Sequence, residues 1–175
     1  MPEVVDILGG LDVYSEYAFT TGWESGHEME VVEGWNSFNG EEALAFCRER
    51  HNLADGDNQR GKNQQAVITA MLKKVLSPTM LLKASSIINQ VGQGVETNIS
   101  QPQINAVVKD QLSTGASWTI QSVAAKGIDA TDYPYSASST EVYVMYPDQS
   151  SVDEIISLIN TVENGGMLES GEQLN

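Results

Sequence analysis

The pattern of apolar and polar residues along the chain predicts a mixture of short helices and strands. Val4–Leu8 is typical of the end of a helix, which stops at the glycine pair Gly9 and Gly10. Leu11–Phe19 alternates between apolar and polar positions and predicts a strand, and Met29–Val32 predicts another. The remaining expected elements, in chain order, are a loop over 23–27, a turn over 34–39, helices over 40–47, 57–76, 79–91 and 101–112, strands over 95–98, 118–124 and 141–146, a polar loop over 127–140 and a helix over 151–162.

This order of elements predicts a mixed α/β fold in which a central sheet is flanked by helices. With 175 residues, of which 41% are apolar, the chain is long enough to bury one core. We therefore expect one domain over residues 1–164. The polar, glycine-containing segment 165–175 reads as a disordered tail.

The charge of the chain excludes some partners. Its net charge is −15, whereas proteins that bind nucleic acids neutralise phosphates with Lys and Arg. An anionic membrane surface is disfavoured as a direct partner for the same reason. No Lys or Arg occurs before Arg48 or after Lys126, so only the middle of the chain should attract an anion.

All three arginines of the chain, Arg48, Arg50 and Arg60, fall within one stretch, Asn39–Met71. Arg presents a planar set of donors that suits phosphate or carboxylate, and this clustering makes the stretch a candidate oxyanion site. Arg48 and Arg50 point the same way only if the chain there is extended. The structural alternative, without a ligand, is that both arginines pair with surface acids.

The second helix of this stretch has a mixed stripe. Asp57 is expected at its N-cap, and its free N–H groups add to the anion site. The stripe starts polar and becomes apolar, which predicts a helix whose first turns line a cleft and whose end enters the core. Its members are Asp57, Arg60, Gln64, Val67 or Ile68, and Met71. In the alternative without a ligand, Asp57 only caps the helix.

Three further features have an ordinary interpretation beside a functional one. Cys47 is expected to be a buried apolar thiol, the alternative being a nucleophile with His51 as its base. His27 has nearby acids that suit a metal, but their spacing favours a solvated loop. The tyrosines suit sugar stacking, or else they cover a sheet edge; they are Tyr133, Tyr135, Tyr143 and Tyr146.

The central stretch resembles the signature of the LytR-CpsA-Psr family. The family pattern has a Gly, an Ala-Leu pair, an aromatic residue, two arginines, an acidic loop and a Gly-Asp-x-x-Arg motif. The matching residues are Gly40, Ala43, Leu44, Phe46, Arg48, Arg50, Gly56, Asp57, Arg60, Asn63 and Gln64. Val4–Thr21, Val95–Ser100 and Tyr143–Ile156 resemble other parts of a capsule-type member. Asn63 stands where many members carry Arg, and we interpret it as a mark of the subfamily.

This resemblance implies an α/β/α sandwich of which the chain is the C-terminal part. The family's domain normally starts about a hundred residues earlier, so we expect an N-terminally truncated fragment. The earlier part carries a further arginine, the carboxylates that hold Mg²⁺ and the transmembrane segment. Among the residues of this chain, the resemblance implies no metal ligand. It places the protein at the extracellular face of the bacterial cytoplasmic membrane.

The resemblance also implies a phosphotransferase that moves a capsule or teichoic-acid-type glycopolymer from a polyprenyl-pyrophosphate carrier to peptidoglycan. Arg48, Arg50 and Arg60 would hold the pyrophosphate, Gln64 would donate a neutral hydrogen bond, and Asp57 would orient arginines. One alternative is a fragment that binds pyrophosphate or polymer without catalysis. A transcription regulator is disfavoured, since the chain has no basic face. A sheet edge left exposed by truncation is expected to make the chain dimerise.

Overall fold

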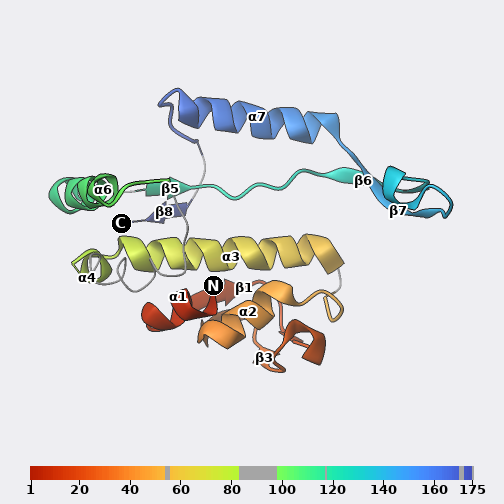
Figure 1. Cartoon of the computed structure of the whole chain (residues 1–175), viewed down its shortest axis with the longest axis horizontal. Helices are drawn as coiled ribbons and strands as arrows, with labels where there is room; N and C mark the ends of the chain where they lie inside the picture. The colour runs from red at the N-terminus through yellow and green to blue at the C-terminus, as the bar shows by residue number, and fades with distance from the viewer. Residues whose placement is uncertain (54–55, 83–97, 117, 170–171, 175) are drawn as a thin grey trace. The chain divides into compact units, whose positions relative to one another are not determined.

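The computed structural model describes residues 1–53, 56–82, 98–116, 118–169 and 172–174 (Figure 1). These residues form two compact units, one of Met1–Trp118 with Gln173–Asn175 and one of Thr119–Glu172. Residues 95–97 of the strand expected over 95–98 and the end of the helix expected over 79–91 lie outside the described residues. The mixed α/β class is confirmed, and the described strands pair two by two. The single domain expected over 1–164 stays a prediction.

The first unit contains most of the helices and strands. Its elements are α1 (Pro2–Ile7), β1 (Leu11–Ser15), β2 (Phe19–Thr20), the 3₁₀ helix η1 (Trp23–Ser25), β3 (Glu30–Val31), β4 (Gly34–Phe38), α2 (Gly40–Arg48), α3 (Gly56–Leu76), α4 (Pro78–Leu81) and α6 (Gln101–Thr114). α6 agrees with its prediction, with Ser100 as N-cap and Gly115 as a left-handed C-cap.

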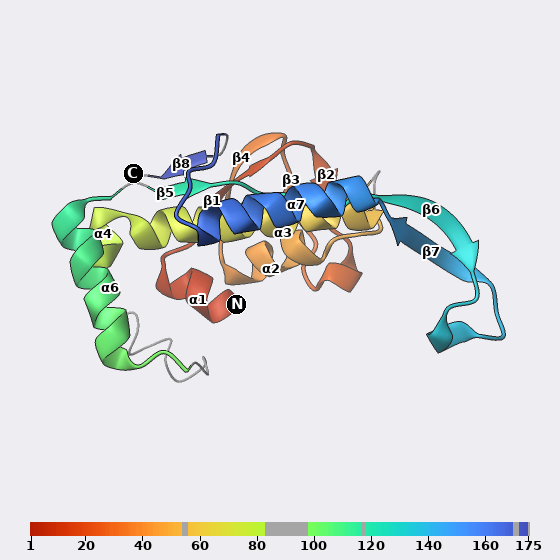
Figure 2. The ribbon, with the colours of Figure 1, turned by 90° about the horizontal axis from the view of Figure 1, so that it is seen from above.

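The core of this unit lies where two helices meet a strand pair. β1 and β4 pair antiparallel, with Leu11 opposite Phe38, and both side chains are buried. α3 lies against both α2 and β1 (Figure 1 and Figure 2). Phe46 of α2 and Val67 of α3 are fully buried in this core, and the Phe46 ring stacks on Phe19 with 5.7 Å between the ring centroids. Burial of such large side chains stabilises a fold by roughly 1.5–3 kcal/mol each.

The turn predicted over 34–39 is wrong, because Gly34–Phe38 forms the strand β4. Gly, Asn and Ser favour turns in isolation, but here their backbone groups pair with β1. Asn36 uses its side chain to close the tight connection from β3: its Nδ2 donates to the Val32 carbonyl at 2.9 Å, and its Oδ1 accepts from the Val32 N–H at 3.0 Å.

α2 begins with a capping box and a second carboxylate. The Asn39 side chain accepts from the Glu42 N–H, and the Glu42 carboxylate accepts from the Asn39 N–H. Asp6 of α1 accepts from the Gly40 N–H at 2.8 Å. A Cβ atom at Gly40 would overlap the Pro2 carbonyl group, so only glycine allows α1 to pack this closely on α2.

α3 ends at Leu76 as predicted but begins at Gly56, so Asp57 lies in its first turn and not at its N-cap. Gly56 has a φ of +48°, and this left-handed conformation lets the chain enter the helix one residue early. The predicted stripe is also shifted by one position, because the buried residues of α3 include the polar Gln59 and Asn63. The neighbouring Ile68 is 57% exposed.

The end of α3 is fastened to the turn between α1 and β1. Gly9 and Gly10 adopt positive φ values of 77° and 82°, which turns both carbonyl groups towards a common donor. Lys74 Nζ donates to the Gly9 and Gly10 carbonyls at 3.3 and 2.8 Å. This contact joins residues that are far apart in the sequence.

The second unit is built on a hairpin and one helix. Its elements are β6 (Gly127–Asp132), the 3₁₀ helix η2 (Tyr135–Ala137), β7 (Val142–Pro147) and α7 (Gln149–Glu163), while β5 (Trp118–Ile120) and β8 (Glu172–Leu174) lie at its sequence boundaries. The loop predicted over 127–140 is wrong for residues 127–132, because these polar residues pair antiparallel with β7. β8 lies inside the segment 165–175, and the disorder predicted for this segment as a whole stays a prediction.

Two tyrosines of this hairpin bond to aspartates. Tyr143 donates to Asp129 at 2.7 Å, and Tyr146 donates to Asp132. The hydrogen bond between Tyr146 and Asp132 holds the pKa of Asp132 below its usual range and raises the pKa of Tyr146. Within the described part of the chain, we find no helix with the length and hydrophobicity needed to span a bilayer.

Gly40→Ala tests the close packing of α1 on α2. The added methyl group must displace the Pro2 backbone, and we expect a loss of about 1–3 kcal/mol of unfolding free energy in urea denaturation. Gly61→Ala in α3 is the matched control, because a Cβ atom there meets nothing within 4 Å. It should be neutral or stabilise by up to ~1 kcal/mol. Equal stability of the two variants would contradict this account of Gly40.

Candidate functional site

The candidate anion site lies where α2 ends. Arg48 is the last residue of α2, and Glu49 leaves the helix with φ −57° and ψ 134°. Arg50 follows outside the helix, so the chain is extended at Glu49, between the two arginines, while Arg48 still belongs to the helix. Arg48 and Arg50 are both exposed.

α3 is tied to this helix end by two side-chain amides. Asn63 Nδ2 donates to the Phe46 carbonyl at 3.2 Å, and Gln64 Nε2 donates to the Cys47 carbonyl at 3.3 Å. The last four carbonyl groups of a helix have no partner within it, so these amides act as a cap supplied by another helix. Arg60 lies one turn before Gln64 on the same face of α3. The half-buried Arg60 therefore belongs to the face that meets the end of α2.

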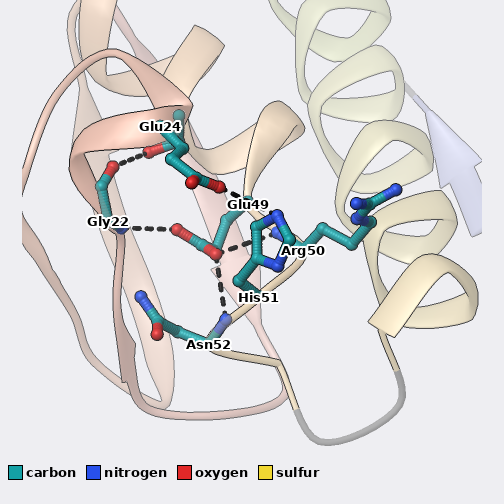
Figure 3. A network of polar contacts seen from close by, with 7 residues as sticks. Gly22, Glu24, Glu49, Arg50, His51 and Asn52 are labelled. Atoms are coloured by element: carbon teal, nitrogen blue, oxygen red, sulfur yellow. Dashed lines mark hydrogen bonds and ion pairs between the residues drawn. The ribbon is translucent and has the colours of Figure 1, made fainter.

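Glu49 stands between the two arginines and is only 3% exposed. Its Oε2 accepts from the Gly22 N–H at 2.5 Å, and its Oε1 accepts from the N–H groups of Arg50 at 2.9 Å and Asn52 at 3.0 Å (Figure 3). Burial alone would raise the pKa of Glu49, but N–H groups of Asn52, Gly22, Arg50 and His51 hold it below its usual range. Glu49 is therefore ionised at neutral pH.

The loop after α2 makes further contacts with the segment between β2 and β3. Asn52 Nδ2 donates to the Thr20 carbonyl at 3.0 Å. His51 Nε2 lies 2.9 Å from a Glu24 carboxylate oxygen, although both side chains are more than half exposed. The Arg48 guanidinium lies beside Gly26, where its Nη1 is 3.9 Å from the position of an added Cβ atom.

Comparison with known proteins identifies the family. The family model LytR_cpsA_psr matches residues 1–160. The chain belongs to the LytR_cpsA_psr family. Biofilm regulatory protein A of Streptococcus mutans is 37% identical over 101 residues, which are 55% of this chain and 25% of that protein. A protein of Halalkalibacterium halodurans named polyisoprenyl-teichoic acid–peptidoglycan teichoic acid transferase TagU is 32% identical over 97 residues, 55% of this chain and 31% of the relative.

Solved structures show the same fold. The chain superposes on TagV of B. subtilis with a TM-score of 0.71 at 22% identity, covering 95% of this chain and 61% of TagV. The protein gbs0355 of Streptococcus agalactiae gives a TM-score of 0.64 at 27% identity, covering 88% of this chain and 50% of that one. This family member therefore spans between a quarter and about three fifths of the length of these proteins.

The structure gives several residues of the family motif a physical reason. Gly40 allows the contact with α1, Phe46 fills the core, and Asn63 caps α2. The roles predicted for Arg48, Arg50, Arg60 and Gln64 towards a ligand stay predictions. So does that of Asp57, whose side chain is not described.

Sequence reasoning missed Glu49 and Asn52. A charged residue between two arginines in an acidic protein reads as a solvated position, and only the fold brings the Gly22 N–H to it. The available signal was local: an acid directly after a helix, followed by turn-forming residues, suits a carboxylate that accepts from backbone N–H groups.

Cys47 takes the ordinary interpretation, whereas that of the His27 side chain stays a prediction. Cys47 is buried, and desolvation raises the pKa of its thiol to about 11. The His27 carbonyl accepts from the buried Thr21 hydroxyl at 2.6 Å. Among the described residues, no three His, Cys, Asp or Glu side chains are grouped as a metal site requires.

Asn63→Leu tests the cap on α2. The variant leaves the buried Phe46 carbonyl without its donor and should lose about 1–3 kcal/mol of unfolding free energy. Gln64→Leu is the matched control: Gln64 is exposed, water can replace its amide, and the loss should stay below about 1 kcal/mol. Urea denaturation measures both losses. A larger loss in Gln64→Leu than in Asn63→Leu would contradict the cap.

The thiol pKa predicts slow alkylation of Cys47. At pH 8 about one thiol in a thousand is ionised at pKa 11, against roughly one in four for an ordinary thiol. Iodoacetamide should therefore modify the native chain at least ~100-fold more slowly than the chain in urea. Mass spectrometry of quenched samples follows the reaction. Equal rates would contradict the raised pKa, and a faster rate in the native chain would point to an activated thiol and revive the nucleophile interpretation.

Proposed function

We propose that this chain carries the arginine side of the active site of a cell-envelope glycopolymer transferase. In this proposal Arg48, Arg50 and Arg60 bind the pyrophosphate of a polyprenyl-linked donor, and the acceptor is peptidoglycan. The name of the TagU relatives, polyisoprenyl-teichoic acid–peptidoglycan teichoic acid transferase, supports this reaction class. The capsule-type polymer suggested by the sequence is one substrate within that class.

One observation carries the proposal: two side-chain amides of α3 donate hydrogen bonds to the end of α2. They place the face of α3 that bears Arg60 against the helix end from which Arg48 and Arg50 emerge. Transfer from a pyrophosphate builds negative charge on oxygen atoms around phosphorus, and fixed positive charges stabilise it without covalent chemistry. An acidic chain with all its arginines at one helix junction suits this task.

The other predicted groups have supporting roles in this proposal. The Gln64 amide already bonds to Cys47, so we assign Gln64 first to holding α3 against α2 and then to the ligand. Asp57 orients arginines from the first turn of α3. We propose, as the family resemblance implies, that the carboxylates that hold Mg²⁺ lie outside this sequence.

The remaining proposals concern the whole protein. They are a membrane anchor outside this sequence and a location at the extracellular face of the bacterial cytoplasmic membrane. The alternative function is a module that binds pyrophosphate without catalysis. Self-association through an exposed sheet edge stays a prediction.

The proposal predicts binding of a short prenyl pyrophosphate. Farnesyl pyrophosphate, titrated calorimetrically with and without Mg²⁺, should bind the native chain. Arg48→Ala and Arg60→Ala should each weaken binding about 10–100-fold, because each removes a charge-assisted contact of roughly 1.5–3 kcal/mol. Lys109→Ala, which removes an exposed cation of α6, is the control and should change affinity less than twofold.

The outcomes separate the alternatives. Equal losses in all three variants would indicate a general charge effect and no arginine site. Binding without transfer of a labelled polymer to peptidoglycan would favour the binding module. A folded chain that binds nothing would refute both functions for this sequence.

A further inference from the structure

A buried acid in the middle of an anion site needs an explanation. Glu49 lies between Arg48 and Arg50, and its negative charge opposes the ligand that the arginines are proposed to bind. Burying a carboxylate is costly unless hydrogen bonds replace its water. At 3% exposure, Glu49 is the only acid among the buried residues of the described chain.

The carboxylate is held by the backbone. Its described donors are the N–H groups of Gly22, Arg50 and Asn52, at 2.5 to 3.0 Å. Two of these residues belong to the loop after α2, and Gly22 lies 27 residues earlier in the chain. Glu49 therefore fixes the arginine-bearing loop against the segment between β2 and η1.

Other contacts of this loop run in the same direction. Asn52 donates to the Thr20 carbonyl, and the Arg48 guanidinium lies beside Gly26, at the far end of the same β2–β3 connection. Figure 3 shows the Arg50 side chain leaving the loop on the side away from the Glu49 carboxylate. Arg48 and Arg50 thus lie on either side of Glu49, whose hydrogen bonds hold the loop backbone in place.

We propose that Glu49 is a positioning residue for the pyrophosphate site. It sets the separation of Arg48 and Arg50 through the backbone of residues 49–52 and does not touch the ligand. The inference rests on the proposed function. A site arranged before the ligand arrives loses less entropy on binding and keeps its charges where they are needed.

Replacement of Glu49 by Gln separates positioning from simple charge. Removing a negative charge beside an anion site should tighten binding if charge alone matters. Positioning predicts weaker binding. The Gln side chain replaces one carboxylate oxygen with an NH₂ group, which cannot accept a hydrogen bond from the backbone N–H groups that face it. We expect Glu49→Gln to bind farnesyl pyrophosphate at least tenfold more weakly. Glu24→Gln, which removes an exposed acid paired with His51 in the same region, is the control and should stay within about twofold of the native affinity.

A readout without ligand tests the positioning directly. We expect the Nε–H groups of Arg48 and Arg50 to be ordered in ¹⁵N relaxation of the native chain and to lose order in Glu49→Gln but not in Glu24→Gln. If the native chain fails to bind farnesyl pyrophosphate, the proposed function fails while this comparison still tests Glu49.

The inference is overturned by a folded Glu49→Gln chain with native or higher affinity, or with unchanged order at both arginines. Should Glu49→Gln not fold, Glu49→Asp replaces it, because the shorter side chain keeps the charge but draws the carboxylate away from the Gly22 N–H. A several-fold loss of affinity with reduced order at Arg50 is then expected, and native values for both would overturn the inference.

Discussion

The unpaired carbonyl groups at the end of α2 are the constraint on which the candidate site depends. A helix that stops inside a protein must find donors for them, and α3 supplies two side-chain amides. This requirement fixes where α3 crosses α2 and which of its faces meets the helix end. The same crossing buries Val67 against the core around Phe46. The arginines are placed by the way one helix ends.

Elements with strong local signals were predicted well. The helix over 40–47 was correct because first-turn acids and a compact apolar face specify it, and α6 was correct because Pro102 and Gly115 mark its ends. β4 was missed because Gly34 and Asn36 read as turn residues, whereas the partner strand β1 decides their conformation. Strand pairing is not local, and one sequence does not report it.

The candidate site rests on a different kind of signal, and its roles towards a ligand stay predictions. Clustering indicates Arg48, Arg50 and Arg60 directly, since cationic residues are rare in this chain. Periodicity misplaced the inner face of α3, because it assigns polar residues to solvent, while Asn63 and Gln59 are buried. Glu49 was missed for the same reason, because a charged residue is assigned to solvent by default. Buried polar groups follow the partners that the fold brings to them, and those partners are distant in sequence.

The contact between Lys74 and the Gly9–Gly10 turn has a consequence for how the chain reaches its native state. The two ends of the Lys74–Gly10 hydrogen bond are 64 residues apart. Contacts of such long separation are slow to form, because the entropy of closing the intervening loop is lost before the contact stabilises the fold. One side of the core formed by α1, β1 and α2 thus stays uncovered until the end of α3 has been synthesised. During that interval the half-built unit exposes apolar side chains to other chains and to chaperones.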